Sequence, residues 1–220
     1  MNMDTLVLAS ASPRRAGILR QLGIDFEQIV SRIVDEQTET GTPKDHVLLL
    51  SKRKAKDIAQ RTSARWILGA DTIVVFRDRI MGKPDDADSA VRMLSELSGN
   101  VHRVLTGLTL IDTRINQALS QYEETKVWIR QLSSGEIDEY IATGEPLDKA
   151  GAYAIQGLGS TLVERIEGCY YNVVGLPIVR MIDMMRSLEF PFQLNTIVQR
   201  ETVPSDTLST SKGANREDLQ

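Results

Sequence analysis

The run from Trp66 to Phe76 is the segment that most constrains this chain, because it is almost wholly apolar and polar only at Asp71 and Thr72. Such a run is typical of a buried strand. An ionised carboxylate in a buried strand is costly unless a cation, a metal or hydrogen-bond donors compensate its charge. Asp71 is therefore a candidate functional residue. The alternative is a strand that ends near Ala70, with Asp71 capping a turn, but the apolar run continues beyond Thr72 and favours a functional role.

The segment Ser10–Arg15 follows a short apolar run and leads into a helical pattern. Ser12 is a suitable N-cap, and Pro13 is a suitable first helical residue because it lacks the amide hydrogen that would be unpaired there. A helix amino terminus presents amide hydrogens and partial positive charge, and Arg14 and Arg15 add bidentate donors for phosphate oxygens. The segment indicates an anion site, with a capped helix and solvated arginines as the open alternative.

The rest of the chain alternates between strand and helix patterns, with cap signals at Thr42-Pro43 and a capping box formed by Ser133 and Glu136. A polar turn around Asn116 joins two of the strands as an antiparallel pair. The patterns predict strands at Leu6–Ala9, Phe26–Val30, Trp66–Phe76, Arg103–Ile111, Glu124–Arg130 and Leu162–Ile166. They predict helices from Pro13 to near Gly23, from Pro43 to about Arg61, at Asp86–Ser98, from Ser133 to Gly144, and from Pro177 onward.

Length and composition indicate one globular domain, since 220 residues with 41% hydrophobic and 25% charged residues can bury a sizeable core. From Gln199 onward polar residues dominate and apolar periodicity disappears, so burial could not repay the entropy of ordering the chain. We therefore expect one catalytic domain over residues 1–198 and a disordered tail over residues 199–220.

Charge and residue usage exclude several classes of function. A formal net charge of −4 gives no global field to attract a polyanion, so nucleic acid is a poor default partner. The single cysteine, Cys169, fits a reducing compartment, and two histidines, His46 and His102, favour neither a Ser-His-Asp triad nor a zinc site. No apolar stretch reaches the length of a membrane span. We expect a cytoplasmic protein without a membrane partner, whose chemistry depends on carboxylates, lysines and a hard divalent metal.

Lys54 and Lys83 are candidate phosphate ligands, because triphosphate hydrolysis needs several cations near the charged oxygens. Lys54 lies in a charge run on a helix, which is usually a solvated face, whereas Lys83 sits in a tight Gly-Lys-Pro turn and is better placed. The small residues of Asp148–Gly157 suit a loop that lets a ligand approach the backbone, where Gln156 could read a base edge. The alternative is that Gln156 has no ligand to recognise and is simply one of the polar residues common near turns.

Five separated segments resemble those of Maf proteins in order and spacing, over a stretch from about Leu6 to about Leu188. They are Ser10-Ala-Ser-Pro-Arg-Arg15, Gly69-Ala-Asp-Thr72, Gly82-Lys-Pro84, Asp148-Lys-Ala-Gly-Ala-Tyr153 with Ile155-Gln-Gly157, and Asn172-Val-Val-Gly-Leu-Pro177. The resemblance implies an α/β fold with a bent mixed sheet flanked by helices and two lobes around a cleft, as in inosine-triphosphate pyrophosphatases. It also suggests a homodimer.

The same resemblance implies hydrolysis of a nucleoside triphosphate to the monophosphate and pyrophosphate, with a divalent cation such as Mg²⁺ or Mn²⁺. It implies that Asp71 is the general base and that Glu36 joins Asp71 in binding metal. It further implies phosphate binding by Ser10, Arg14, Arg15, Lys54 and Lys83.

The segment Asp148–Gly157 resembles the dTTP/UTP subgroup of the family, and Arg14, Thr72 and Gln156 match positions associated with substrate choice. An amide side chain can satisfy both the carbonyl acceptors and the imide donor of uracil or thymine. Three alternatives stay open: a 7-methyl-GTP pyrophosphatase, an enzyme that removes modified or noncanonical nucleotides, and a non-enzymatic regulator of septum formation in cell division.

Overall fold

The computed structural model describes residues 5–33 and 41–192. The helices are α1 (Pro13–Gln21), α2 (Pro43–Ala59), α3 (Ala87–Leu97), α4 (Ser134–Ala142), α5 (Tyr170–Val174) and α6 (Ile178–Ser187), with short 3-10 helices η1 (Glu145–Asp148), η2 (Ala150–Ala152) and η3 (Gly157–Leu162). The strands are β1 (Leu6–Ala9), β2 (Phe26–Gln28), β3 (Trp66–Phe76), β4 (Arg79–Met81), β5 (Val101–Asp112), β6 (Gln117–Ile129) and β7 (Val163–Glu167). Glu36 and the predicted tail lie outside the described residues.

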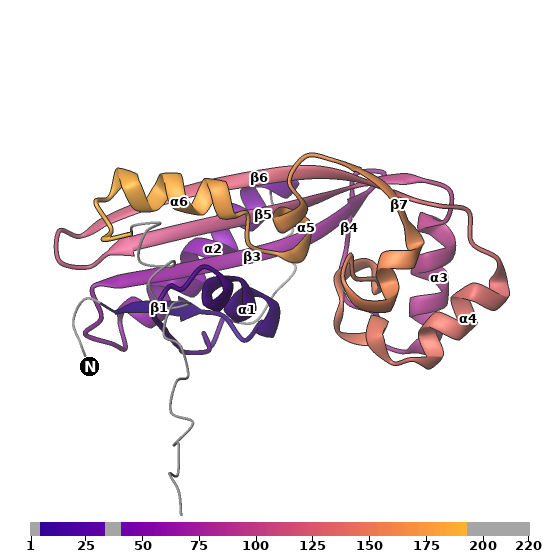
Figure 1. Cartoon of the computed structure of the whole chain (residues 1–220), viewed down its shortest axis with the longest axis horizontal. Coiled ribbons are helices and arrows are strands. Elements are labelled where there is room, and N and C mark those ends of the chain that lie inside the picture. The colour runs from indigo at the N-terminus through magenta and orange to yellow at the C-terminus, as the bar shows by residue number, and fades with distance from the viewer. Residues whose placement is uncertain (1–4, 34–40, 193–220) are drawn as a thin grey trace, which may run out of the picture.

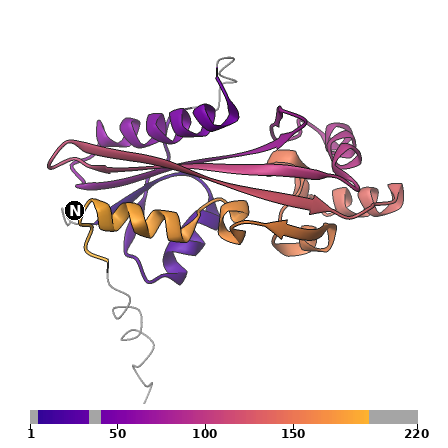
Figure 2. The ribbon, with the colours of Figure 1, turned by 90° about the horizontal axis from the view of Figure 1, so that it is seen from above.

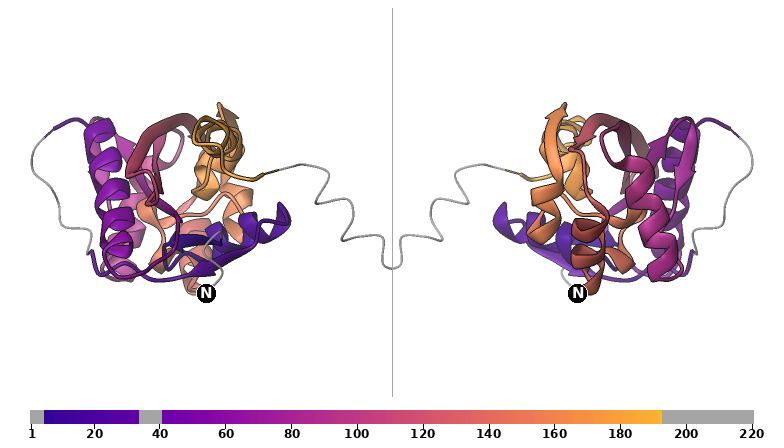
Figure 3. Two further views of the ribbon diagram at one scale, coloured as in Figure 1. Left: turned by 90° about the vertical axis from the view of Figure 1, so that its left-hand side faces the viewer. Right: turned by 90° about the vertical axis from the view of Figure 1, so that its right-hand side faces the viewer.

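The strands form one mixed seven-stranded sheet in the order β2-β1-β3-β5-β6-β7, with β4 paired to β3. Strands β2, β1 and β3 are parallel, whereas all other pairs are antiparallel. Helix α2 covers one face of the sheet and α6 the other, while α3 and α4 lie at the far end (Figures 1 and 2). Figure 3 shows α2 along one flank of the molecule. The predicted α/β class with helices flanking a mixed sheet is confirmed. Within the described parts of the chain, no helix is long and apolar enough to span a membrane.

Alternation along β3 sends its two polar residues to opposite faces of the sheet. Leu68 packs in the core with α1 and α6, and Ala70 lies in the same cluster. Ile67 packs with α2 instead. Because successive side chains of a strand point to opposite faces, Asp71 faces α2 and Thr72 faces α1. The two adjacent polar residues that interrupt the apolar run therefore place one polar side chain on each face of the sheet.

Two glycines bring α2 unusually close to the sheet. A Cβ on Gly69 would lie 2.3 Å from the carbonyl oxygen of Ser51, and one on Gly107 would lie 2.2 Å from that of Val47. Neither separation is possible for real atoms, so the helix backbone rests on the sheet only because both residues lack side chains. This close approach places Lys54, also on α2, against the middle of β3.

The sheet has a gap beside the centre of β3. Strand β1 pairs with β3 up to Gly69, and β4 pairs with it from Val74 onward. Between them, Ala70–Ile73 keeps β5 on one side and has no strand among the described residues on the other. The segment that begins at Ser10 leaves the carboxyl end of β1 at this gap. In open α/β sheets the carboxyl ends of parallel strands are where ligands bind.

Two strands differ from the sequence expectation, and the short helix α5 was not predicted. Strand β4 (Arg79–Met81) was not predicted, because the tight turn before it uses Arg77 and Asp78 at positive φ rather than a glycine or asparagine. Strand β6 begins at Gln117 and not at Glu124, because its first half is polar and only half-buried, which hides the strand pattern. The other predicted elements agree with the structure to within two residues at each end.

Candidate active site

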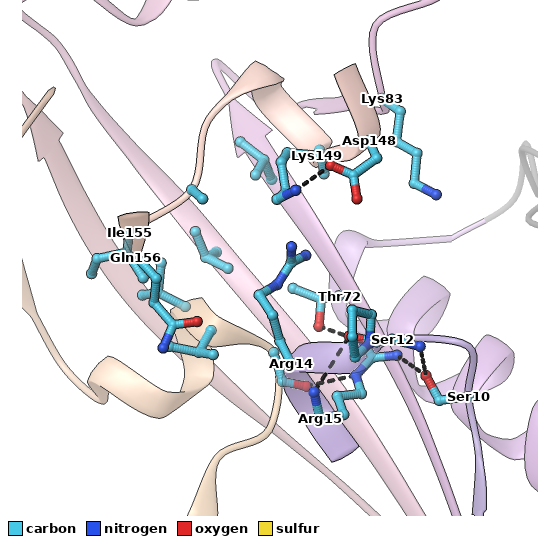
Figure 4. A pocket seen from close by; sticks show the side chains of 18 of the residues that line it. Ser10, Ser12, Arg14, Arg15, Thr72, Lys83, Asp148, Lys149, Ile155 and Gln156 are labelled. Carbon is cyan, nitrogen blue, oxygen red and sulfur yellow. Dashed lines mark hydrogen bonds and ion pairs between the residues drawn. The ribbon is translucent and has the colours of Figure 1, made fainter. Parts of the chain in front are cut away.

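A pocket of about 320 Å³ lies at the gap in the sheet and is lined from both ends of the molecule. The loop before α1, the middle of β3 and α2 form one side, and the segments around η1 and η2 form another. The pocket gathers all predicted site residues that the structure describes: Ser10, Arg14, Arg15, Lys54, Asp71, Thr72, Lys83 and Gln156. Figure 4 shows most of these side chains converging on one space. The structure therefore brings these residues together at one pocket, and Glu36 lies outside the described residues.

The loop before α1 is fixed by its own hydrogen bonds. Pro13 begins the helix as predicted, and the Ser12 side chain accepts from the Arg15 amide at 3.4 Å. The Ser12 amide in turn donates to Ser10 Oγ at 3.2 Å. From β2, the side-chain amide of Gln28 donates through Nε2 to the Ser10 carbonyl at 2.8 Å. The positive end of α1 is thus held rigidly at the pocket, which suits it to bind an anion.

Arg15 ties three segments together beneath the pocket. Its Nε donates to the Gly175 carbonyl at 2.8 Å, Nη1 donates to Ser10 Oγ at 2.9 Å, and Nη2 donates to Thr72 Oγ1 at 2.9 Å. Gly175 has φ +113°, and a side chain there would approach the Thr72 hydroxyl. Arg15 therefore clamps the loop, β3 and the turn between α5 and α6, in addition to the phosphate-binding role predicted for it.

Asp71 is buried and paired with a cation. Lys54 Nζ donates to Asp71 Oδ1 at 2.7 Å, and the two side chains are only 13% and 5% exposed. The other carboxylate oxygen, Oδ2, is buried and has no hydrogen-bond partner within the described residues. Buried polar atoms nearly always have partners, so such an exception indicates a functional group. One oxygen is held by the lysine, and the other keeps its capacity to accept a proton or a metal ion.

The opposite wall of the pocket carries a second charged group. Lys149 donates to the Asp148 carboxylate and also to the Glu145 carbonyl, the latter at 3.4 Å. The hydrogen bond from Lys149 lowers the pKa of Asp148, and the Arg14 guanidinium lowers it further. Figure 4 shows Asp148 and Lys149 on the same side of the pocket as Lys83. Asp148 was not among the predicted site residues, although it opens one of the five motifs.

The segment that follows Gln156 is anchored by Glu145, the first residue of η1. The Glu145 carboxylate accepts from Tyr140 Oη at 2.8 Å, from the Gly159 amide at 2.9 Å and from the Leu158 amide at 3.1 Å. Burial would raise the pKa of Glu145, but these hydrogen bonds outweigh it and lower the pKa. The carboxylate thus fixes the backbone beside Gln156, so that its side chain projects from a rigid support.

A buried histidine and tyrosine link β5 to the pocket wall. His102 Nε2 and Tyr153 Oη lie 2.7 Å apart, and both side chains are buried. Burial lowers the pKa of His102 to about 4 and raises the pKa of Tyr153. The imidazole is therefore neutral at pH 7. The sequence patterns predicted no role for His102. A single histidine in a strand does not indicate which distant residue, here Tyr153, it will contact.

We expect the stability of the protein to fall as the pH is lowered from about 6.5 to about 4, because of His102. In the unfolded chain its imidazole takes up a proton near pH 6.5, whereas in the folded protein it does so only near pH 4. As the pH falls, the unfolded state therefore gains the proton first. The free energy of unfolding decreases by about 3 kcal/mol across that pH range. Urea unfolding at several pH values measures the effect. His102→Gln should remove it, and equal pH slopes for the two proteins would contradict the assignment.

The fold and the pocket define an α/β protein with a cleft lined by several cationic side chains around one buried, lysine-paired carboxylate. The family model described as "Maf-like protein" matches residues 5–188. The chain belongs to this family.

Curated relatives match nearly the whole described chain. One from a Thermoanaerobacter species, named dTTP/UTP pyrophosphatase, is 50% identical over 190 residues, covering 86% of this chain and 98% of the relative. Relatives with the same name from Acetivibrio thermocellus and Geotalea uraniireducens are each 48% identical, covering 84% of this chain and 95% of the relative. A solved structure of a Vibrio cholerae protein aligns with a TM-score of 0.33 at 11% identity, over 64% of this chain and 78% of that one.

Proposed function

We propose that the chain is a dTTP/UTP pyrophosphatase, which cleaves a nucleoside triphosphate between its α and β phosphates. The products are the nucleoside monophosphate and pyrophosphate. The observation that carries the proposal is the buried Asp71–Lys54 pair at the centre of a pocket rich in cations, in a chain of this family. The names of the curated relatives support the choice of dTTP and UTP.

The charges around the pocket suit a triphosphate. Cationic side chains come from three separate segments, with Arg14 at the start of α1, Lys54 on α2 and Lys83 after β4. The amino terminus of α1 adds partial positive charge on the side of Ser10. Phosphoryl transfer is catalysed almost entirely by positioning and by stabilising charge, so this arrangement supports phosphate-binding roles for these residues and for Arg15.

A divalent cation, Mg²⁺ or Mn²⁺, fits the donors of the pocket. Asp71 Oδ2 has no partner among the described residues, and one or two carboxylates with substrate phosphate oxygens form an ordinary Mg²⁺ site. No group of three or more His, Cys, Asp or Glu side chains in the described ranges could hold a metal without substrate. Asp71 would hold the ion with the phosphates, and Glu36 is the second ligand expected from the resemblance. A bound cation would neutralise phosphate charge.

In the proposed reaction, Asp71 orients a water molecule and accepts its proton as the water oxygen bonds to the α phosphorus. The bond from the α phosphorus to the oxygen bridging to the β phosphate breaks, and pyrophosphate leaves in line with the attack. Lys54 holds Oδ1, which fixes the orientation of the carboxylate for this step. The cationic side chains of the pocket stabilise the charge on the leaving group.

We propose that Arg14, Thr72 and Gln156 select the nucleotide. Gln156 extends from the backbone anchored by Glu145, and its amide can donate to a carbonyl of the base or accept from the imide. Thr72 lies beside Asp71 but on the opposite face of β3, so it can contact the substrate without joining the carboxylate in the reaction. This division supports separate tasks for the two adjacent residues.

A pyrophosphate-release screen tests the proposal. The purified protein is assayed with Mg²⁺ or Mn²⁺ against dTTP, UTP, 5-methyl-UTP, CTP, ITP and 7-methyl-GTP, and the products are separated. We expect monophosphate and pyrophosphate, fastest from dTTP and UTP. Fastest turnover of 7-methyl-GTP or of a modified nucleotide would replace the proposed substrate, and release of orthophosphate would exclude the proposed reaction. No product from any triphosphate would favour a non-enzymatic regulator.

We further propose that the protein acts in the cytoplasm as a homodimer, without a nucleic-acid or membrane partner. The single cysteine and the net charge of −4 support the location and the absence of a polyanionic partner. The dimer rests on the family resemblance. Analytical ultracentrifugation of the assayed protein tests the dimer, because a single species at the monomer mass would exclude it.

A further inference from the structure

A chain of hydrogen bonds runs from the pocket into the core through two threonines. Thr72 and Thr106 face each other on β3 and β5, with their Oγ1 atoms 2.9 Å apart. Thr106 Oγ1 donates to the backbone carbonyl of Asn172 at 3.1 Å. Thr106 and Asn172 are fully buried, whereas Thr72 is half-buried and lines the pocket. The chain thus links a pocket hydroxyl to a carbonyl that water cannot reach.

The direction of every proton in this chain follows from its last member. A carbonyl oxygen only accepts, and a threonine hydroxyl has one proton, so Thr106 gives its proton to Asn172. In the contact between the two threonines, Thr72 must then be the donor. Arg15 Nη2 donates to Thr72 Oγ1 at 2.9 Å and occupies one of its two lone pairs. What Thr72 can offer to a ligand is therefore the other lone pair and no proton.

The carbonyl that sets this direction is itself held in place. The Asn172 side chain donates to the Val104 carbonyl and to Thr125 Oγ1, each at 2.9 Å. Thr125 Oγ1 donates to the Cys169 carbonyl at 3.0 Å. These bonds tie α5 to β5 and β6 in the interior, so the acceptor for Thr106 does not rotate away. The orientation of the Thr72 hydroxyl is built into the fold.

We propose that Thr106 is a positioning residue that makes Thr72 an obligate hydrogen-bond acceptor toward the nucleotide. The inference rests on the proposed function, since it concerns how dTTP and UTP are chosen. Thr72 recognises a hydrogen-bond donor that both nucleotides share, either the imide N3–H of the base or the 3′ hydroxyl of the sugar. Cytosine has a lone pair at N3, so an acceptor-only Thr72 would repel CTP at that position and disfavour it.

Thr106→Val tests the inference, because valine keeps the shape of threonine but cannot accept the proton of Thr72. Thr72 then regains a proton to offer. We expect the ratio of kcat/KM for UTP over CTP to narrow about three- to tenfold, the worth of one hydrogen bond. Thr106→Ser keeps the hydroxyl and should preserve the ratio. If the 3′ hydroxyl is the recognised donor, the ratio of UTP over 3′-deoxy-UTP narrows instead. An equal loss on all nucleotides, or unchanged ratios, would overturn the proposal.

Two additions keep the test decisive. Thr72→Val removes the acceptor itself and should narrow the same ratio, so it replaces Thr106→Val if that variant does not fold. The α,β-methylene analogues of UTP and CTP, which cannot be cleaved, give the same comparison as a ratio of dissociation constants. If the wild type releases no pyrophosphate, but Thr106→Val still narrows its preference among these analogues, the result would contradict the proposed function and support the role of Thr106. Equal affinities of the wild type for the UTP analogue, the CTP analogue and the 3′-deoxy form of the UTP analogue would overturn that role.

Discussion

Asp71→Asn is expected to lower pyrophosphate release by about 10²- to 10⁴-fold, the contribution of a general base, while the protein still folds. Asparagine has nearly the shape of aspartate and can still accept the hydrogen bond from Lys54 at the Oδ1 position. It cannot take a proton from water, and it offers no charge to a metal ion. The measurement is kcat for dTTP and UTP, with a thermal melt of the same preparations.

A matched control for this variant is Asp112→Asn. Asp112 is also a fully buried carboxylate, and Arg65 donates to both of its oxygens, but it lies at the end of β5 and does not line the pocket. Removing its charge should lower stability by about 1–3 kcal/mol and leave kcat unchanged. A folded and active Asp71→Asn variant would exclude Asp71 as the base. An equal loss of activity in the control would mean that stability, and not chemistry, limits the assay.

Gly107→Ala is expected to lower the free energy of unfolding by about 3 kcal/mol, at the upper end of the cost of overpacking. The new Cβ would lie 2.2 Å from the Val47 carbonyl oxygen and 2.4 Å from its carbon. These are backbone atoms, so no side-chain rotation relieves the contact and α2 must move away from the sheet. Because Gly107 is paired with Asp71, the displacement also draws Lys54 from the carboxylate. Activity should therefore fall together with stability.

Gly17→Ala is the control for this prediction, since it makes the same chemical change in a different setting. A Cβ on Gly17 would meet nothing within 4 Å, and the residue lies inside α1. Alanine should raise the free energy of unfolding by about 0.5–1 kcal/mol, because glycine loses more conformational entropy in a helix. Urea unfolding and kcat report both variants. Destabilisation of similar size at the two positions would contradict the close packing of α2.

The parts of the fold that the sequence predicted are those with strong local signals. The start of α1 was predicted because Ser12 and Pro13 are adjacent in sequence and act within one turn. Strand β3 was predicted because its apolar run is long and uninterrupted except at Asp71 and Thr72, and the structure shows that the strand continues through them. Helix α5 was not predicted, since Tyr170–Val174 is too short for a helical period to emerge.

Sequence motifs identified the candidate site residues, but they did not identify the contacts that those residues make with remote parts of the chain. The lining residues came from motifs, but the role of Thr106 gave no signal, because threonine is an ordinary residue of strands. Its partner Asn172 lies far away in the chain, and only the fold brings the two together. The pairing of Arg15 with Gly175 has the same origin, since these residues are also brought together by the fold. Local patterns identify residue types, whereas contacts between remote segments depend on the packed structure.

The length of the central strands has a consequence for how the protein can move. Strands β3, β5 and β6 contain 11, 12 and 13 residues and run without a break past the pocket. They connect the lobe that holds α1 and α6 to the lobe that holds α3 and α4 (Figure 1). At about 3.3 Å per residue, each spans roughly 35–45 Å. Within residues 5–33 and 41–192, no irregular connection interrupts these strands at the cleft, which disfavours rotation of the lobes about a hinge. Any closure over a nucleotide must come from twisting of the shared strands, which limits its amplitude and makes the two lobes unfold as one cooperative unit.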